Sequence, residues 1–115
     1  MSTEPTIFER IVAREIPADI VFENDRLLAI RDIAPKAPLH LLVFPKEGTY
    51  KNVGELSASD PQLLAEIVGT ARNMAEQLSD GQFRLVFNTG RDAQQTVFHC
   101  HAHVIAGREL TWPPG

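Results

Sequence analysis

Three histidines stand at alternate positions near the C-terminus of this 115-residue chain, at His99, His101 and His103. In an extended strand, side chains at positions i, i+2 and i+4 share one face. The positions beside and between them carry only apolar residues, Phe98, Cys100, Ala102 and Val104. The chain has four histidines in all, so this run predicts a strand that gathers three imidazoles on one face and is hydrophobic on the other.

The spacing of the row favours one reacting histidine in the centre, with a supporting histidine on either side. Adjacent histidines lie about 6.8 Å apart at Cα and the outer two about 13.5 Å apart, whereas a metal ion needs nitrogens at about 2.0–2.1 Å. We therefore predict that His101 acts and that His99 and His103 orient it or bind the substrate. A neutral imidazole is a nucleophile that can attack phosphorus and form a covalent intermediate. A metal site built from the row and His40, or a purely structural role, remain the alternatives.

The length, net charge and cysteine content of the chain limit the kinds of protein that it can be. A chain of 115 residues is predicted to form a single domain over residues 1–115, with residues 1–5 as a flexible N-terminus. The net charge of −4 argues against a broad nucleic-acid surface. No stretch approaches the roughly 20 apolar residues of a membrane helix, and the N-terminus lacks the features of a secretory signal. The single cysteine, Cys100, excludes an internal disulfide, so a cytoplasmic location is expected, with this thiol as a small core residue.

The hydrophobic pattern predicts two helices and five strands. The helices span residues 7–15, ended by Pro17, and 61–78, between the cap Asp60 and Gly81. The strands span residues 20–23, 27–32, 39–44 and 83–87, followed by the histidine run. Residues 34–38 and 88–96 are loops, and residues 46–57 give no clear pattern. Short connections favour an α+β fold, a five-stranded antiparallel sheet with both helices on one face. The histidine row is then expected on the opposite, open face or at its edge.

Other polar groups are expected near the row. His40 begins the third strand and is predicted to orient the row, because hydrogen bonds between imidazoles fix their tautomers. The loop 88–96 could supply neutral donors to phosphate oxygens, or it could be a solvated connection. Asp32 could accept hydrogen bonds from the vicinal hydroxyls of a ribose, or it could cap the loop that follows. The two common nucleotide-binding fingerprints, the Walker sequence and Gly-x-Gly-x-x-Gly, are absent.

With these residues in view, the chain resembles the histidine triad (HIT) family. The family signature is His-φ-His-φ-His-φ-φ with φ apolar, and the matching residues are His99-Cys100-His101-Ala102-His103-Val104-Ile105. The resemblance extends from about Ile7 to the end and includes residues 15–18, 32–40, 43–46, 88–90 and 107–108. The closing Trp112-Pro113-Pro114-Gly115 is similar to one branch, the histidine triad nucleotide-binding proteins or purine nucleoside phosphoramidases.

The resemblance implies a nucleotide hydrolase. By it, His101 attacks the α-phosphorus of an AMP or GMP ester or phosphoramidate and forms a nucleotidyl-histidine, from which water releases AMP or GMP. His103 contacts the phosphate and helps the leaving group depart, while His99 and His40 orient His101. Asp32 takes the ribose hydroxyls. No cofactor is implied.

The resemblance also implies binding residues and an assembly. Phosphate and leaving-group atoms are held by Asn88, Gln95 and Thr96, with Gln94 as an alternative to Gln95. The purine is walled by Ile33, Leu27 and Leu41. The implied assembly is a homodimer with a continuous ten-stranded sheet, in which the tail 108–115 lies near the active site. Trp112 then reaches the partner's site and bears on the choice of leaving group.

Two departures and two alternatives accompany the resemblance. The family often has Gly-Gly-Gln-Ser or Gly-Gly-Gln-Thr before the row, where this chain has Ala93-Gln94-Gln95-Thr96. Thr6 and Glu9 lie in the region of the cysteine pair of some zinc-carrying relatives, so no structural zinc is expected. A dinucleoside polyphosphate hydrolase of the same family is one alternative function. A non-catalytic nucleotide- or metal-binding module is the other.

Overall fold

The computed structural model describes residues 4–115. Residues 1–3, part of the segment expected to be flexible, lie outside the described residues. The helices are α1 (Ile7–Val12), α2 (Val53–Ser59) and α3 (Pro61–Leu78), with a short 3-10 helix, η1 (Arg91–Ala93). The strands are β1 (Ile20–Glu23), β2 (Leu27–Arg31), β3 (Leu39–Pro45), β4 (Arg84–Val86) and β5 (Ala102–Ala106).

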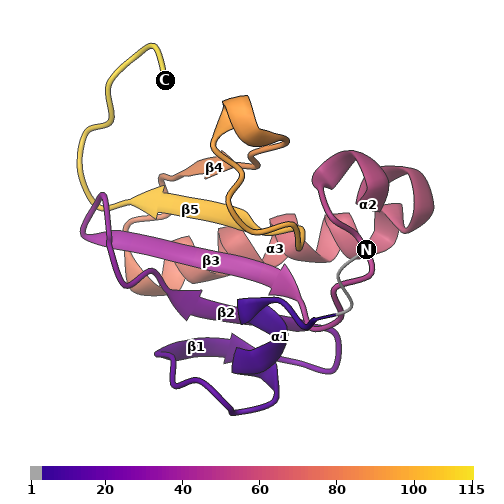
Figure 1. Cartoon of the computed structure of the whole chain (residues 1–115). Coiled ribbons are helices and arrows are strands. Elements are labelled where there is room, and N and C mark those ends of the chain that lie inside the picture. Colours follow the sequence, from indigo (N-terminus) through magenta and orange to yellow (C-terminus); the bar gives the residue numbers. More distant parts are fainter. Residues whose placement is uncertain (1–3) are drawn as a thin grey trace.

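The strands form one five-stranded sheet in the order β1-β2-β3-β5-β4 (Figure 1). Every neighbouring pair is antiparallel, which confirms the predicted architecture. The register pairs His40 with Ile105 and Leu42 with His103. The central strands β3 and β5 therefore bring the lone histidine close to the last histidine of the row.

The fifth strand is shorter than predicted. Its ladder with β3 stops at the pair Val43–Ala102, so only His103 of the row is a strand residue. Two features end the ladder. Pro45 has no N–H to donate, and the Cys100 N–H donates instead to the Tyr50 carbonyl at 2.9 Å. His99 and His101 consequently lie on an irregular segment that leads into β5.

The two faces of the sheet are covered by different helices. The larger core packs α2 and α3 against residues such as Leu41 and Val43, together with the predicted apolar positions Cys100, Ala102 and Val104. The smaller core packs Phe8 and Ile11 of α1 against Leu28, Ile30 and Phe44. Figure 1 shows α3 behind the sheet and α1 in front of it. The expectation that both helices share one face is wrong, because β2 is buried on both sides and needs a cover on each.

Side-chain caps explain where the helices begin. Asp60 accepts a hydrogen bond from the Leu63 N–H at 3.1 Å and Pro61 occupies the first turn of α3, as predicted. Gly81, with φ of +87°, follows the end of this helix. The third helix, α2, was not predicted, since Leu56 is its one buried residue and a helix of seven residues leaves little periodicity to detect. Asn52 caps it through the Glu55 N–H.

The C-terminal tail leaves the sheet after β5 and runs away from its edge (Figure 1). Arg84 of β4 donates to the Thr111 carbonyl at 2.9 Å, while the Trp112 side chain is 81% exposed. Within residues 4–115, no helix has the length and apolar character needed to cross a membrane.

Candidate active site

The structure brings all four histidines together on the face of the sheet that α1 covers. The ring centroids of His40 and His103 are 5.2 Å apart, and those of His101 and His103 are 5.3 Å apart. Phe8 of α1 packs edge-on against the rings of His99 and His101, at 5.4 and 4.9 Å. The row therefore lies on the face opposite α3, as predicted, but that face is partly closed by a helix.

Hydrogen bonds define the tautomer of His99. Its Nε2 lies 2.6 Å from the Pro45 carbonyl oxygen and its Nδ1 lies 2.7 Å from Thr6 Oγ1. A carbonyl can only accept, so Nε2 carries the hydrogen. In the neutral ring, Nδ1 then accepts the hydroxyl hydrogen of Thr6. The ring is fully buried, and this burial lowers the pKa of His99, so the neutral form is favoured.

The same reasoning applies to His101. Its Nδ1 lies 2.8 Å from the backbone carbonyl oxygen of His99, so Nδ1 carries a hydrogen and donates it. The neutral ring then has its lone pair on Nε2. Burial lowers the pKa of His101 as well, which keeps this lone pair unprotonated near neutral pH. A buried, neutral imidazole with an oriented lone pair is suited to nucleophilic attack.

A second chain of hydrogen bonds orders the other two histidines. The Lys36 N–H donates to Nδ1 of His40 at 3.1 Å, so the hydrogen of the neutral ring is on Nε2. That nitrogen lies 2.9 Å from Nδ1 of His103 and 3.4 Å from a carboxylate oxygen of Asp32. His103 accepts at Nδ1, and its own hydrogen is therefore on Nε2. The site thus pairs a lone pair on His101 with an N–H on the neighbouring His103.

Burial also keeps the second pair neutral. It lowers the pKa of His40. It lowers the pKa of His103 to about 4, with smaller contributions from the nearby rings of His101 and His40. Burial raises the pKa of Cys100 to about 11, so this thiol stays protonated among core residues, as its apolar position predicted.

Asp32 caps the loop that follows it, which is one of the two roles that its sequence position left open. One carboxylate oxygen accepts from the Ala34 N–H at 2.8 Å and so caps the loop. The other faces His40. Ile33 beside it is 98% exposed.

Some of the expected binding residues lie elsewhere. Leu27 and Leu41 are fully buried in the core between the sheet and α3, on the face away from the histidines, so they cannot wall a purine there. Gln95 is also buried. Its carboxamide accepts from the Gly90 N–H and donates to the Lys51 and Val97 carbonyls, which leaves it no hydrogen for phosphate.

The loop before the row nevertheless exposes other polar groups. Gln94 and Thr96 are exposed, and Gln94 adopts a positive φ of 65°. Asn88 donates its side-chain amide to the Ala93 carbonyl at 2.7 Å, so its role in this structure is to shape the loop. Gln94, not Gln95, is therefore the glutamine available to a ligand.

Five partners of the histidines were not predicted: Thr6, Phe8, Lys36, Phe44 and Pro45. Four of these contribute a ring or a backbone group, and no pattern in the sequence marks such contacts. Thr6 is different, because Thr-x-x-Glu before an apolar run is the signature of a capping box, and Thr6 and Glu9 form one.

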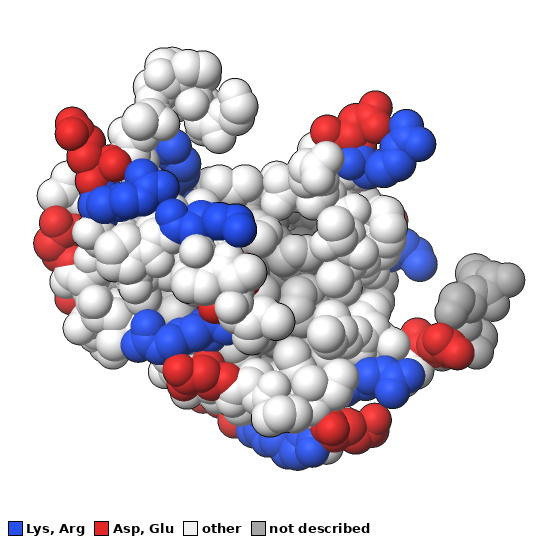
Figure 2. Space-filling model, turned by 60° about the vertical axis from the view of Figure 1, so that its left-hand side comes forward, with Lys and Arg blue, Asp and Glu red and all other residues white. Residues whose placement is uncertain are grey.

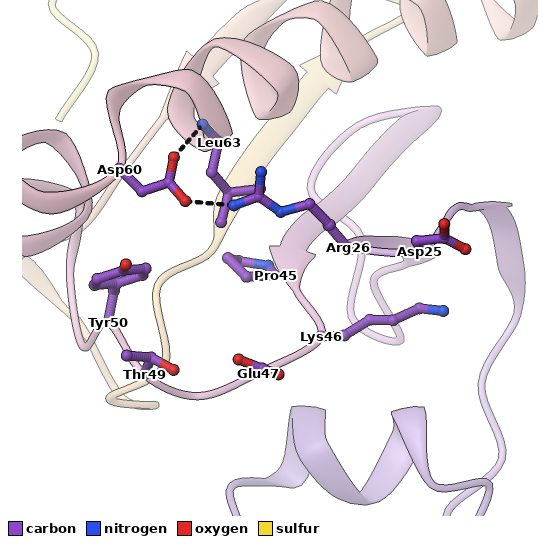
Figure 3. Close-up of a pocket in the computed structure, with 9 residues that line it drawn as sticks. All are labelled: Asp25, Arg26, Pro45, Lys46, Glu47, Thr49, Tyr50, Asp60 and Leu63. Carbon is purple, nitrogen blue, oxygen red and sulfur yellow. Dashed lines mark hydrogen bonds and ion pairs between the residues drawn. The ribbon is translucent and has the colours of Figure 1, made fainter.

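A separate hollow of about 470 Å³ lies beyond the end of β3 (Figure 3). No histidine lines it. Its two cations are already ion-paired, Arg26 with Asp60 and Lys46 with Glu23. Figure 2 shows acidic and basic side chains interspersed around an uncharged, hollowed central area, with no continuous basic surface on that face.

Comparisons with known proteins find relatives that are similar to this chain in sequence and in fold. Residues 5–111 match the family model described as "Scavenger mRNA decapping enzyme C-term binding". An uncharacterized HIT-like protein of Synechococcus elongatus is 49% identical over 115 residues, 98% of this chain and 99% of that protein. Adenylylsulfatase HINT1 of Arabidopsis thaliana is 41% identical over 117 residues, 99% of this chain and 79% of that protein. A solved HIT family hydrolase of Legionella pneumophila is 42% identical, with a TM-score of 0.89 over 96% of this chain and 100% of the other.

Proposed function

The chain belongs to the histidine triad family, and on that premise we propose that it is a nucleotide hydrolase. Its proposed substrates are purine nucleoside 5′-phosphoramidates and related adenylates, and its products include AMP or GMP. The hydrogen-bond polarity around His101 carries the proposal, because it leaves an unprotonated Nε2 beside a second ring that has an N–H to give.

In the first step, the Nε2 lone pair of His101 forms a bond to the α-phosphorus as the bond to the leaving amine breaks. The ring becomes cationic on bonding to phosphorus, and its Nδ1–H remains hydrogen-bonded to the His99 carbonyl, which stabilises that charge. The Nε2–H of His103 donates to a phosphate oxygen and passes its proton to the nitrogen of the departing amine. In the second step, water attacks phosphorus and gives a proton to the vacated Nε2 of His103, the bond to His101 breaks and the nucleoside monophosphate departs.

The remaining proposed contacts with the substrate are assigned to side chains that a ligand can reach. Asp32 binds the ribose hydroxyls through the carboxylate oxygen that faces His40, while Ile33 contacts the purine. Gln94 and Thr96 bind phosphate or leaving-group atoms. We also propose a homodimer with a ten-stranded sheet, since the outer edge of β4 has no strand beside it among the described residues and Trp112 is exposed beyond it. Light scattering of the full chain tests this assembly.

A metal-binding module is the competing proposal that an observation favours. Ligand atoms of Asp32, His40 and His103 lie within 4.8 Å of one another. The hydrogen bonds oppose this use, because Nδ1 of His40 accepts the Lys36 N–H and the hydrogen of the ring therefore occupies the nitrogen that would bind the ion. Full activity of a metal-free preparation in chelator would exclude a required metal, whereas stoichiometric bound metal with no turnover would favour the module.

The main test follows the covalent intermediate. Purified protein is mixed with adenosine 5′-phosphoramidate, quenched in base and digested at alkaline pH, and the peptide containing His101 is examined for the added mass of AMP. We expect the adduct in the wild type and neither adduct nor turnover in His101→Ala, with an unchanged circular dichroism spectrum. Val68→Ala on the exposed side of α3 is the control and should keep full activity. Turnover without any adduct on His101 would refute the mechanism.

Substrate comparison separates the activities within the family. Adenosine phosphoramidate, adenylyl sulfate and diadenosine polyphosphate share the adenylyl group and differ in the leaving group. We expect the phosphoramidate to have the highest kcat/KM. A preference for diadenosine polyphosphate would instead assign the chain as a dinucleoside polyphosphate hydrolase.

A further inference from the structure

The N-terminus of α1 touches the histidine row through a side chain that the proposed reaction does not use. Thr6 Oγ1 accepts a hydrogen bond from the Glu9 N–H at 3.1 Å and lies 2.7 Å from Nδ1 of His99. A hydroxyl has one hydrogen and two acceptor sites. Because the helix N–H occupies an acceptor site, the hydrogen of Thr6 is available for the imidazole. One hydroxyl therefore caps a helix and donates to a histidine.

The other ring nitrogen of His99, Nε2, also forms a hydrogen bond. Nε2 donates to the Pro45 carbonyl at 2.6 Å, so the imidazole is held at both nitrogens, by α1 on one side and by the end of β3 on the other. The ring is fully buried and packs edge-on against Phe8 and Phe44. Rotation of this ring would break both hydrogen bonds. Because the ring is buried, water could not replace them, and the free-energy cost strongly favours the observed orientation.

His99 is linked directly to the reacting histidine. Its own backbone carbonyl accepts the Nδ1–H of His101 at 2.8 Å. The anchored side chain and the accepting carbonyl belong to one residue on a segment without ladder hydrogen bonds to β3, so the ring contacts substitute for the strand pairing that this segment lacks. Phe8, two residues after Thr6, contacts both rings.

We propose that Thr6 is a positioning residue for the reaction, and that it acts by donating its hydroxyl hydrogen to His99, which fixes that ring as the Nε2–H tautomer and so fixes the carbonyl that orients His101. This inference rests on the proposed function. Thr6 touches no reacting atom, and its effect passes through the backbone of His99.

Glu9 supports the same arrangement. One of its carboxylate oxygens accepts from the Thr6 N–H at 2.9 Å, and the other lies 3.4 Å from the Gly48 N–H. The carboxylate therefore ties the start of α1 to the loop after β3, the loop that follows Pro45. A Cβ at Gly48 would come within 2.9 Å of the Glu9 side chain, so a larger residue at this position would displace the carboxylate from its present place.

Three substitutions at Thr6 separate the donor role from the capping role. Thr6→Ser keeps the acceptor and the donor. Thr6→Asp keeps a good capping acceptor but has no hydrogen to donate, and its carboxylate favours a hydrogen on Nδ1 of His99, beside the titratable groups Glu9 and His101. Thr6→Val removes both functions. Asn52→Ala is the control for the loss of a helix cap, because the Asn52 side chain caps α2 by accepting from the Glu55 N–H and not through a bond to a histidine.

We expect the kcat for adenosine phosphoramidate to fall about 10- to 100-fold in Thr6→Asp and Thr6→Val, with KM changed less than about threefold, because a slightly misplaced nucleophile lowers rate more than binding. Thr6→Ser should restore the wild-type kcat, and Asn52→Ala should retain it. Wild-type kcat in Thr6→Asp would overturn the proposal, since capping alone would then account for any loss in Thr6→Val.

A second measurement is independent of activity. Long-range proton–nitrogen correlation spectra of ¹⁵N-histidine protein report which ring nitrogen carries the hydrogen. We expect His99 as the Nε2–H tautomer in the wild type and in Thr6→Ser, protonated at Nδ1 in Thr6→Asp, and a shifted Nδ1–H signal of His101 in that variant. This pattern in a protein without phosphoramidase activity would refute the proposed function alone, while an Nδ1–H tautomer of His99 in the wild type would refute the role of Thr6.

Discussion

Replacing His103 by asparagine should flatten the dependence of stability on pH. Burial, with help from the neighbouring imidazoles, lowers the pKa of His103 from an ordinary value of 6.5 to about 4 in the folded chain. In the unfolded chain the ring binds a proton as the pH falls below about 6.5, whereas the folded chain resists until about pH 4. The unfolded state therefore gains protons first, and the free energy of unfolding decreases as the pH falls through this window.

The expected size follows from the shift. This pKa shift corresponds to a change in the free energy of unfolding of about 3 kcal/mol at most. Because water partly screens the ring, the expected change is about 1–2 kcal/mol. Asparagine is the matched replacement, since its side-chain oxygen can accept the hydrogen bond from His40 that Nδ1 of His103 accepts in the wild type. Asparagine does not titrate.

Urea unfolding followed by far-ultraviolet circular dichroism measures the effect. Between pH 7 and pH 4.5 the wild type should lose about 1–2 kcal/mol more than His103→Asn. The exposed substitution Val68→Ala should leave the slope of the wild type unchanged. Equal slopes for wild type and His103→Asn would show that His103 titrates alike in both states, and the account of its desolvation would be wrong.

Three further predictions concern the surroundings of the row. Phe8→Ala should lower the free energy of unfolding by about 3–4 kcal/mol, because Phe8 stacks on Phe44 at 4.4 Å and covers two imidazoles; a loss below about 1 kcal/mol in chemical denaturation would contradict its place in the core. Gln95→Ala should cost about 1–3 kcal/mol, since it leaves buried backbone groups of the loop without partners, and an unchanged melting temperature would argue against this. Gln94→Gly should raise stability by up to about 1 kcal/mol by relieving the left-handed backbone at this residue, and a decrease would mean that φ of 65° carries no strain.

The strands and the long helix were predictable because their patterns are local. The alternation in β5 and the apolar stripe of α3 each repeat within one element. The side of the sheet that each helix covers was not predictable in this way. In β2, the four residues 27–30 are all buried, so there is no alternation to show that one face meets α3 and the other meets α1.

The candidate site was also predictable only in part. The four histidines and Asp32 assemble as expected because β3 and β5 are neighbours in the sheet. The assignments of Leu27 and Leu41 to a purine wall failed, since strand parity places both on the far face with α3. Gln95 was misassigned because a polar residue in a polar loop gives no sign that its carboxamide is consumed by backbone groups.

The amino-acid sequence by itself determined that three imidazoles would be close together and that a fourth could join them, because an extended backbone turns alternate side chains to one side. Only the tertiary structure decided which nitrogen of each ring carries a hydrogen. The partners that make this choice for His99 are Thr6 and Pro45, which lie 93 and 54 residues away along the chain. A neutral imidazole places its hydrogen toward whichever neighbour can accept it, and those neighbours come into position only when α1 and the end of β3 pack against the row.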